Sequence, residues 1–506
     1  MLWEPQIIEG GNWTINLFTL LDESSKLHAG RPALISEQSR ITYRDLYRSV
    51  IAIEQSLRSL GLKKGDKVAV MLPNIPEFVF SYFAVVRAGA VAVTLSTAST
   101  PRELLYILDN SEATIFVTQA SAEKKYREIE QRLKTCHSLF VVDAPDHQLA
   151  FDAQETPVVA VDPDDPAVMI YTAGLTGTPL GALLTHRNLL SQANMIQDVL
   201  RRTPDDVGLS LIPLFHAFGA TVNMLNVIRA GCSTVMMDRL TMDGLFSAIE
   251  RERITYIAAV PRLYLGMIFH EKASKYDLSS LTVCATGGAP MPPEFIPVFE
   301  EKFRVRILEG YGLTEASPAC SFNRLDRQSK PGSIGIPLPS VDIKIVDDHN
   351  HEVAKGSIGE VIVRGENVMK GYYRDDEATH AVIRDGWLHT GDLGYMDEGN
   401  YIFLAGRKKR MIITSGFNVY PREVEAILNL HPAVKNSVVS GREDLMRGEL
   451  VKARIVLKDN SQTDEKDIIR HCKIHLSAYK VPREIEFVPE IDQSLASAPG
   501  HQNVIG

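Results

Sequence analysis

The sequence has few cysteines, no long hydrophobic run and no excess of positive charge. Its five cysteines lie far apart, with neither metal-ligand nor paired spacing, so we expect small buried thiols in a cytoplasmic protein. No stretch approaches the roughly 20 consecutive apolar residues that span a bilayer, and the first residues do not resemble a signal peptide. The formal net charge of −9 argues against non-specific binding to nucleic acid or anionic membranes.

What the chain does have is length and a regular alternation of helix and strand patterns. A chain of 506 residues, 45% of them hydrophobic, is too long for one core and predicts two or more domains. Residues 42–60 have helical spacing, residues 67–72 form an apolar strand pattern, a helix opens at Pro76, and residues 90–95 form the next strand. This rhythm predicts an α/β fold with a parallel sheet and crossover helices.

The pattern changes twice further along the chain. Residues 341–346 and 359–365 are short strand patterns with turns, which predicts a smaller β-rich subdomain. A basic segment, residues 406–410, marks a second boundary, and helix and strand patterns alternate again beyond it. The last hundred or so residues are enough for a small α+β domain.

A glycine-rich segment, residues 171–181, follows the short apolar run 167–170. It reads Tyr-Thr-Ala-Gly-Leu-Thr-Gly-Thr-Pro-Leu-Gly. Its glycines and proline do not suit the interior of a helix or strand, so we expect a buried strand followed by a tight loop. Backbone N–H groups and hydroxyls in such a loop suit a phosphate, although the segment has no Walker ending. An ordinary glycine turn is the alternative for the loop taken alone.

The loop resembles the phosphate loop of the AMP-forming acyl-CoA synthetases, within the adenylate-forming superfamily. That family's usual pattern is Tyr-Thr-Ser-Gly-Thr-Thr-Gly-x-Pro-Lys-Gly. Here Ala173 replaces the serine, Leu175 a threonine and Leu180 the lysine. The resemblance implies that Thr172 and Thr176 contact the nucleotide, and that a loop which holds the β- and γ-phosphates of ATP has lost two hydroxyls and a cation.

A second motif, residues 309–315, reads Glu-Gly-Tyr-Gly-Leu-Thr-Glu after a strand pattern. A tyrosine can stack on a purine, a threonine can bond a phosphate, and a carboxylate can hold a phosphate-bound metal. The resemblance assigns Tyr311 to adenine binding, Gly312 to the nucleotide site, Thr314 to the α-phosphate, and Glu315 to catalysis and to Mg²⁺ if ATP is used. A structural turn with one acid is the alternative.

Residues 286–290, Thr-Gly-Gly-Ala-Pro, lie between a strand pattern and a helix pattern, where α/β sheets bind ligands. The resemblance makes Gly287, Gly288 and Ala289 part of the adenine pocket. A glycine turn closed by a helix-starting proline, Pro290, is a compatible structural explanation.

Four further residues carry the resemblance toward the end of the chain. Asp392, in Trp-Leu-His-Thr-Gly-Asp-Leu-Gly, matches the aspartate that accepts both ribose hydroxyls, and a turn aspartate is the alternative. Arg407 matches a nucleotide-contacting arginine and Lys409 the hinge between domains, where Arg410 departs from the usual acid. Gly416 matches the segment that lines the pantetheine channel, which implies a thiol acceptor, with CoA as the default and a carrier-protein pantetheine left open.

The segment 213–219, Pro-Leu-Phe-His-Ala-Phe-Gly, resembles the family's acyl pocket, with His216 near the carboxyl group that is activated. A lone histidine among apolar residues is more often a satisfied core residue. Amino-acid-activating relatives carry an aspartate in this region, so the apolar segment favours a fatty or aryl carboxylate.

The family plan implies three parts: an N-terminal AMP-binding and acyl-binding domain over residues 1–405, a hinge at 406–410 and a swivelling C-terminal domain over 411–506. The N-terminal domain is expected to contain two doubly wound α/β subdomains and a β-subdomain. The family also has a lysine near its C-terminus that bridges the carboxylate and the α-phosphate. No lysine follows Lys480 in this chain, and an unplaced gap leaves open whether Ala498 or His501 takes that position.

The departures all affect the ATP-consuming half-reaction, whereas the residues for the AMP moiety and the thiol remain. We therefore expect an enzyme that forms an acyl-CoA thioester from an acyl-adenylate and CoA, with weak or absent adenylation, fed by a separate adenylating enzyme. Its C-terminal domain should rest in the thioester-forming arrangement. The alternatives are a complete AMP-forming acyl-CoA synthetase, which also uses ATP and Mg²⁺, and a non-catalytic ligand-binding descendant.

Overall fold

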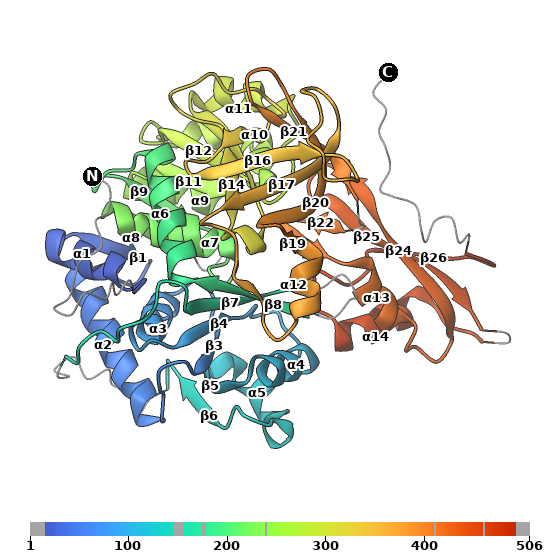
Figure 1. Ribbon diagram of the computed structural model, residues 1–506, viewed down its shortest axis with the longest axis horizontal. Helices are drawn as coiled ribbons and strands as arrows, with labels where there is room; N and C mark the ends of the chain where they lie inside the picture. Colours follow the sequence, from blue (N-terminus) through green and yellow to red (C-terminus); the bar gives the residue numbers. More distant parts are fainter. Residues whose placement is uncertain are drawn as a thin grey trace.

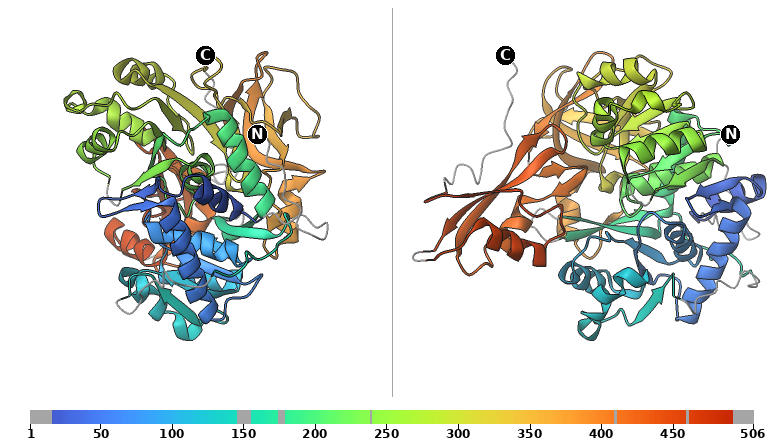
Figure 2. Two further views of the ribbon diagram at one scale, coloured as in Figure 1. Left: turned by 90° about the vertical axis from the view of Figure 1, so that its left-hand side faces the viewer. Right: turned by 180° about the vertical axis from the view of Figure 1, so that it is seen from behind.

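The computed structural model describes residues 16–144, 155–173, 179–237, 240–408, 411–458 and 461–491. Figure 1 shows a large N-terminal body and a smaller C-terminal unit, coloured orange to red, packed against one side of it. The views in Figure 2 show the same division from the side and from behind. The expected α/β class, with a large N-terminal and a small C-terminal domain, is confirmed. No helix in the described ranges combines the length and apolar character needed to cross a bilayer.

The first sheet has seven strands in the order β18-β8-β7-β4-β3-β5-β6. Its strands are β3 (Lys67–Met71), β4 (Val91–Thr94), β5 (Ala113–Thr118), β6 (Ser138–Val141), β7 (Pro166–Ala173), β8 (Pro179–Thr185) and β18 (Gly371–Tyr372). The strands from β3 to β7 run parallel, whereas β8 and β18 are antiparallel at one edge. The helical segments around it are α2 (Tyr43–Ser59), α3 (Pro76–Arg87), α4 (Pro101–Ser111), α5 (Ala120–Arg127) and the 3-10 turn η1 (Glu130–Arg132).

Local sequence sets the helix starts in this part of the chain. The Thr42 hydroxyl accepts a hydrogen bond from the Asp45 N–H and caps α2. Thr100 and Glu103 form a reciprocal capping box at the start of α4. The predicted strand and helix alternation is confirmed here.

The second sheet has nine strands in the order β15-β14-β13-β12-β11-β9-β10-β1-β2. Its strands are β1 (Pro32–Ile35), β2 (Arg40–Thr42), β9 (Val207–Ser210), β10 (Ser233–Met236), β11 (Tyr256–Ala259), β12 (Val283–Thr286), β13 (Arg306–Gly312), β14 (Ala319–Phe322) and β15 (Ile336–Pro337). The strands from β1 to β13 in this order are parallel, and β2, β14 and β15 are antiparallel at the two edges. Its helical segments are α1 (Thr19–Leu27), α6 (His186–Leu200), α7 (Ala217–Ala220), the π-helix η2 (Thr221–Leu225), α8 (Asn226–Ala230), α9 (Met242–Glu252), α10 (Pro261–Phe269), α11 (Phe295–Phe303) and the 3-10 turns η3 (Ala273–Lys275) and η4 (Thr314–Ala316).

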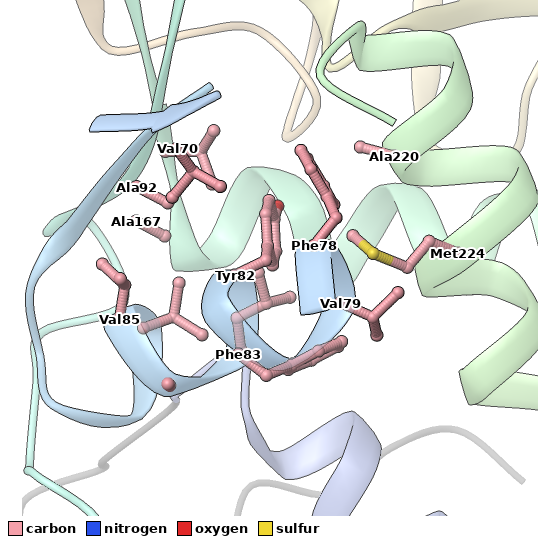
Figure 3. Packing of buried hydrophobic residues seen from close by; sticks show 14 of the residues in the cluster. Val70, Phe78, Val79, Tyr82, Phe83, Val85, Ala92, Ala167, Ala220 and Met224 are labelled. Carbon is pink, nitrogen blue, oxygen red and sulfur yellow. The ribbon is translucent and has the colours of Figure 1, made fainter. Parts of the chain in front are cut away.

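Helix α3 packs between the two large sheets. Its aromatic side chains Phe78, Tyr82 and Phe83 are buried, and one hydrophobic cluster joins them to both neighbours. Figure 3 shows these rings between strand residues of the first sheet and the α7–η2 segment, which carries Ala220 and Met224. This packing fixes the position of the segment that begins at His216.

The remaining elements form the β-subdomain and the C-terminal domain. The first contains β16 (Val341–Val346), β17 (Gly359–Gly365), β19 (Ile383–Arg384), β20 (Trp387–Met396), β21 (Ile402–Arg407) and α12 (Asp376–Val382). The second contains β22 (Ile412–Thr414), β23 (Phe417–Val419), β24 (Val434–Asp444), β25 (Gly448–Leu457), β26 (Glu484–Phe487), α13 (Pro421–Leu428) and α14 (Glu465–His475). Each forms its own sheet of five strands, so both expected units are present.

Three local expectations differ from the structure. The motif 309–315 begins within its strand and not after it, because β13 continues to Gly312 and pairs with β14. Asp392 lies within β20 and not in a turn, opposite Arg407 on β21. The helix after the Thr-Gly-Gly-Ala-Pro segment begins at Phe295, so Pro290 does not start it.

Candidate functional site

A large cleft of about 1720 Å³ lies between the N-terminal body and the C-terminal domain. Most of the residues expected to form the site lie on its walls: His216, Gly287, Gly288, Ala289, Tyr311, Gly312, Thr314, Glu315, Asp392, Arg407 and Gly416. Thr172 joins them through a hydrogen bond to Glu315. Thr176 and Lys409 lie outside the described residues, as do Leu175, Arg410 and the last fifteen residues of the chain.

Asp392 is held by two partners, one on each carboxylate oxygen. The Tyr311 hydroxyl donates to Oδ2 at 2.5 Å, and the Arg407 Nε lies 2.7 Å from Oδ1. Asp392 is buried, and burial together with the neighbouring carboxylate raises the pKa of Tyr311 well above its ordinary value. Because each carboxylate oxygen has two lone pairs, both oxygens keep the capacity to accept further hydrogen bonds from a ligand.

Glu315 is oriented by two hydroxyl groups from the first sheet. The Tyr372 hydroxyl donates to its Oε1 at 2.8 Å, and the Thr172 hydroxyl donates to the same oxygen at 3.2 Å. The backbone N–H of Met369 also donates to the Glu315 carbonyl at 2.8 Å. Sequence reasoning missed Tyr372, which carries no motif of its own and reaches the site only because β18 pairs with β8.

The donor set around Glu315 suits Mg²⁺ only together with a phosphate ligand. Across the described part of the chain, no group of three or more histidine, cysteine, aspartate or glutamate side chains could hold a metal ion. Mg²⁺ is commonly held by one or two carboxylates together with substrate phosphates and water. A single oriented carboxylate on the cleft wall therefore fits that mode of binding.

The glycines of the 286–290 segment allow close approach of the backbone. A side chain on Gly287 would bring its Cβ within 3.1 Å of the Gly310 carbonyl oxygen and 3.6 Å of the Phe218 ring. Gly288 has φ +78°, a conformation that favours glycine. Close packing at Gly287 and the positive φ at Gly288 are therefore enough to explain why these two residues are glycines.

Glu309 is a buried carboxyl on the same wall that sequence reasoning did not single out. Its Oε1 accepts a hydrogen bond from the Met291 N–H at 3.0 Å, while its buried Oε2 has no hydrogen-bond partner. Burial raises its pKa to about 7, against a weaker opposing effect of the Met291 hydrogen bond. The carboxyl is therefore partly protonated near neutral pH.

His216 caps α7 and also lines the cleft. Its Nδ1 accepts a hydrogen bond from the Phe218 N–H at 3.2 Å, and burial lowers its pKa to about 4. The side chain is therefore neutral at pH 7. Apolar side chains from α6, α7, η2 and α10 also line the cleft: Ile196, Leu200, Phe218, Val222 and Leu265.

Gly416 brings the C-terminal domain onto the cleft wall. It has φ +84°, and a Cβ there would lie 2.5 Å from Cγ1 of Val260. The neighbouring Ser415 hydroxyl accepts a hydrogen bond from Arg262 at 3.4 Å. Leu180 of β8 also lines the cleft, at the position where the acyl-CoA synthetase pattern has lysine.

Two family models match most of the chain. The model for AMP-binding enzymes matches residues 21–373, and that for the AMP-binding enzyme C-terminal domain matches residues 423–495. The chain is 35% identical to a long-chain-fatty-acid–CoA ligase of Bacillus subtilis, over 94% of this chain and 92% of that protein.

Solved structures give the same likeness over nearly the whole chain. An o-succinylbenzoate CoA synthetase of Bacillus subtilis, bound with a product analogue, superposes with a TM-score of 0.83 at 28% identity, covering 95% of this chain and 98% of the other. ATP-bound MatB of Rhodopseudomonas palustris superposes with a TM-score of 0.74 at 30% identity, covering 95% and 96%. From its sequence and its fold, the chain belongs to the AMP-binding enzymes and, among them, to the AMP-forming acyl-CoA ligases.

Proposed function

We propose that the protein is a complete acyl-CoA ligase that works in two steps. In the first step a carboxylate oxygen attacks the α-phosphate of ATP, which forms acyl-AMP and releases pyrophosphate. In the second step the CoA thiolate attacks the acyl carbonyl, which forms the thioester and releases AMP. The names of the relatives describe complete CoA ligases and synthetases. These names favour the complete reaction over the half-reaction that we expected from the sequence alone.

The observation that carries the proposal is that both sets of residues face one cleft. The residues expected to hold the AMP moiety, such as Tyr311, Asp392 and Arg407, line the same cleft as Gly416, which is expected to admit the thiol. Acyl-AMP held by the first set would therefore present its carbonyl toward the second.

The proposed acid is a fatty acid, with an aryl acid as the second choice. Ile196, Leu200, Phe218, Val222 and Leu265 line the cleft together with a neutral His216, and none of these side chains is a carboxylate that would pair with an ammonium group. An apolar wall gains about 25 cal/mol for each Å² of hydrocarbon surface that it removes from water. The long-chain ligase relative agrees with this preference.

Three groups of this chain would serve the first step. Glu315, oriented by Tyr372 and Thr172, would hold Mg²⁺, which supplies charge neutralisation on the phosphates. Thr314 would donate a hydrogen bond to the α-phosphate. Asp392 would accept hydrogen bonds from the ribose, with Arg407 keeping the carboxylate in place.

The test supplies purified protein with ATP, Mg²⁺, CoA and a long-chain fatty acid, and measures acyl-CoA, AMP and pyrophosphate. The proposal expects the three products in equal amounts, with none formed when the acid is omitted. A benzoate-type acid run in parallel separates the fatty from the aryl preference. Failure to form acyl-CoA from any of these acids, and also from supplied acyl-AMP, would favour a non-catalytic ligand-binding descendant.

A second candidate is the half-enzyme in which adenylation is weak. It is favoured by Leu180, an apolar side chain on the cleft wall where the family pattern has a cation. Ala173, Leu175 and the missing C-terminal lysine point the same way in the sequence. Loss of one group that stabilises transition-state charge commonly costs ~10²–10³ in rate.

Acid-dependent exchange of labelled pyrophosphate into ATP separates the two candidates. Brisk exchange supports the complete ligase and rules out the half-enzyme. Slow exchange together with rapid conversion of supplied acyl-AMP and CoA supports the half-enzyme, which would need a separate adenylating enzyme to feed it.

A further inference from the structure

A buried ionic cluster joins the two domains at a distance from the motifs described above. The Lys480 ammonium lies 2.9 Å from Oε1 of Glu103 and 2.7 Å from Oε1 of Glu423. The Ser477 hydroxyl donates to Oε2 of Glu103 at 2.8 Å. Glu103 belongs to α4 of the N-terminal body, whereas the other three residues belong to the C-terminal domain.

The cluster is charged and shielded from water. The side chains of Lys480, Glu103 and Glu423 are only 9%, 13% and 10% exposed. Burial opposes the charged form of Lys480, but Tyr479 and the two carboxylates outweigh it and hold the lysine pKa above its ordinary value. Burial also opposes ionisation of Glu103, yet Lys480 and the Thr100 N–H lower the pKa of that carboxyl. At Glu423 burial outweighs the lysine and raises the pKa of the carboxyl, so Lys480 contacts a carboxyl group in each domain.

The cluster is rigidly connected to the segment that lines the cleft. Phe417, next to Gly416, stacks on Tyr479, next to Lys480, with ring centroids 4.6 Å apart and planes 21° apart. Tyr420 and Glu423 continue from the same segment into α13. A rotation of the C-terminal domain that removed Gly416 from Val260 would therefore also separate Lys480 from Glu103.

We propose that Glu103 and Lys480 are positioning residues for the thioester-forming step. The pair holds the C-terminal domain so that Gly416 faces the cleft, and it must open before the domain can adopt an adenylate-forming arrangement. This inference rests on the proposed two-step function, because the pair can change the balance between the two half-reactions only in an enzyme that alternates between two domain arrangements. It assigns to Glu103 a role beyond its place in the capping box of α4.

The variants are chosen so that the local fold survives. Glu103→Gln removes the charge but keeps a side chain that can complete the capping box with Thr100. Lys480→Met removes the cation and leaves Glu103 and Glu423 without compensation, so its effect should be larger. Arg470→Met is the matched control, because Arg470 pairs with Asp467 within the same domain and its side chain is 72% exposed.

The first readout is a pair of half-reactions. For Glu103→Gln we expect conversion of supplied acyl-AMP and CoA to fall ~10-fold, since breaking one partner of a buried ion pair is costly. Acid-dependent pyrophosphate exchange should stay equal or rise, and the control should change neither rate. The double variant should lose no more than Lys480→Met alone, because both changes open the same contact. Equal falls in both half-reactions would overturn the inference, since a merely structural role predicts them.

The second readout measures the domain arrangement and needs no catalysis. Spin labels on Glu128→Cys and Lys466→Cys report the distance between the domains, and the five natural cysteines are buried. The unmodified pair should give one dominant distance, and Glu103→Gln should spread the distribution. An unchanged distribution would also overturn the inference. If wild-type protein shows no pyrophosphate exchange, the complete function fails, while acyl-AMP conversion and the distance measurement still test the pair.

Discussion

Replacing Asp392 with alanine should damage thioester formation from acyl-AMP far more than replacing Leu180 with alanine. Asp392 is buried and accepts hydrogen bonds from Tyr311 and Arg407, so its carboxylate is fixed in the cleft. The proposed ribose contact persists through both steps, because the AMP moiety leaves only with the product. Leu180 should face the β- and γ-phosphates, which have already left as pyrophosphate when acyl-AMP is supplied.

The size of the effect follows from the hydrogen bonds that are lost. A hydrogen bond to a charged group contributes ~1.5–3 kcal/mol, which corresponds to a ~10–150-fold change in rate or affinity. Asp392→Ala also leaves the buried Tyr311 hydroxyl without its acceptor, so the variant should unfold at a lower temperature. Leu180→Ala should remain within ~3-fold of wild type in this half-reaction, because it removes no polar contact.

The assay follows CoA thiol consumption with chemically prepared acyl-AMP, beside thermal unfolding of each variant. Asp392→Asn is the control for shape, since it keeps the side-chain volume while it removes the charge. Rates measured well below each unfolding midpoint separate the loss of binding from the loss of folded protein. Equal sensitivity of Asp392 and Leu180 would refute the assignment of Asp392 to the ribose.

Three further changes test other parts of the cleft. Tyr372→Phe should raise the Mg²⁺ concentration needed for pyrophosphate exchange ~3–10-fold, because Glu315 loses one hydrogen-bond donor. CoA transfer from acyl-AMP should stay unchanged, and an equal loss in both reactions would contradict the positioning role of Tyr372. Gly416→Ala should slow CoA transfer more than exchange, because its Cβ would lie 2.5 Å from Val260 at a φ that disfavours side chains, and a faster transfer would argue against that contact. The pKa of Glu309 is raised from 4.5 to about 7 by burial, so its contribution to stability is present below pH 4.5 and is lost as the pH rises through 7. Glu309→Gln should therefore increase the unfolding temperature relative to wild type at pH 8 but not at pH 5, and parallel pH profiles would show that the carboxyl does not ionise there.

The sequence was sufficient where a local rule and the tertiary structure agree. The helix that begins after Thr42, the parallel strands between Lys67 and Val141, and the separate sheet beyond residue 411 all follow from periodicity. Most of the candidate site residues gather around one cleft, as the resemblance implied. Their assigned chemical roles stay predictions until the variants are measured.

The sequence was insufficient where long-range pairing decides the structure. The sequence left a turn aspartate as the alternative for Asp392, but its strand pairs with β21 and this opposes Asp392 to Arg407. The strand β13 runs on through two glycines because β14 supplies its partner. Tyr372 gave no local signal, and Glu309 received no role although it opens the motif 309–315, since the environment of each depends on residues outside its own motif.

The hydrogen bonds to Glu315 also affect the order in which the nascent chain can mature. Thr172 precedes Glu315 by 143 residues, and Tyr372 follows it by 57 residues. At ~5–20 residues per second, several seconds pass between the synthesis of Glu315 and that of Tyr372, and a longer time passes after Thr172. The seven-stranded sheet cannot receive its edge strand β18 until the start of the β-subdomain has left the ribosome. The carboxylate site is therefore completed only after the strands β16 and β17 of the β-subdomain have been synthesised, and a chain truncated before residue 371 should retain an unpaired sheet edge at β8.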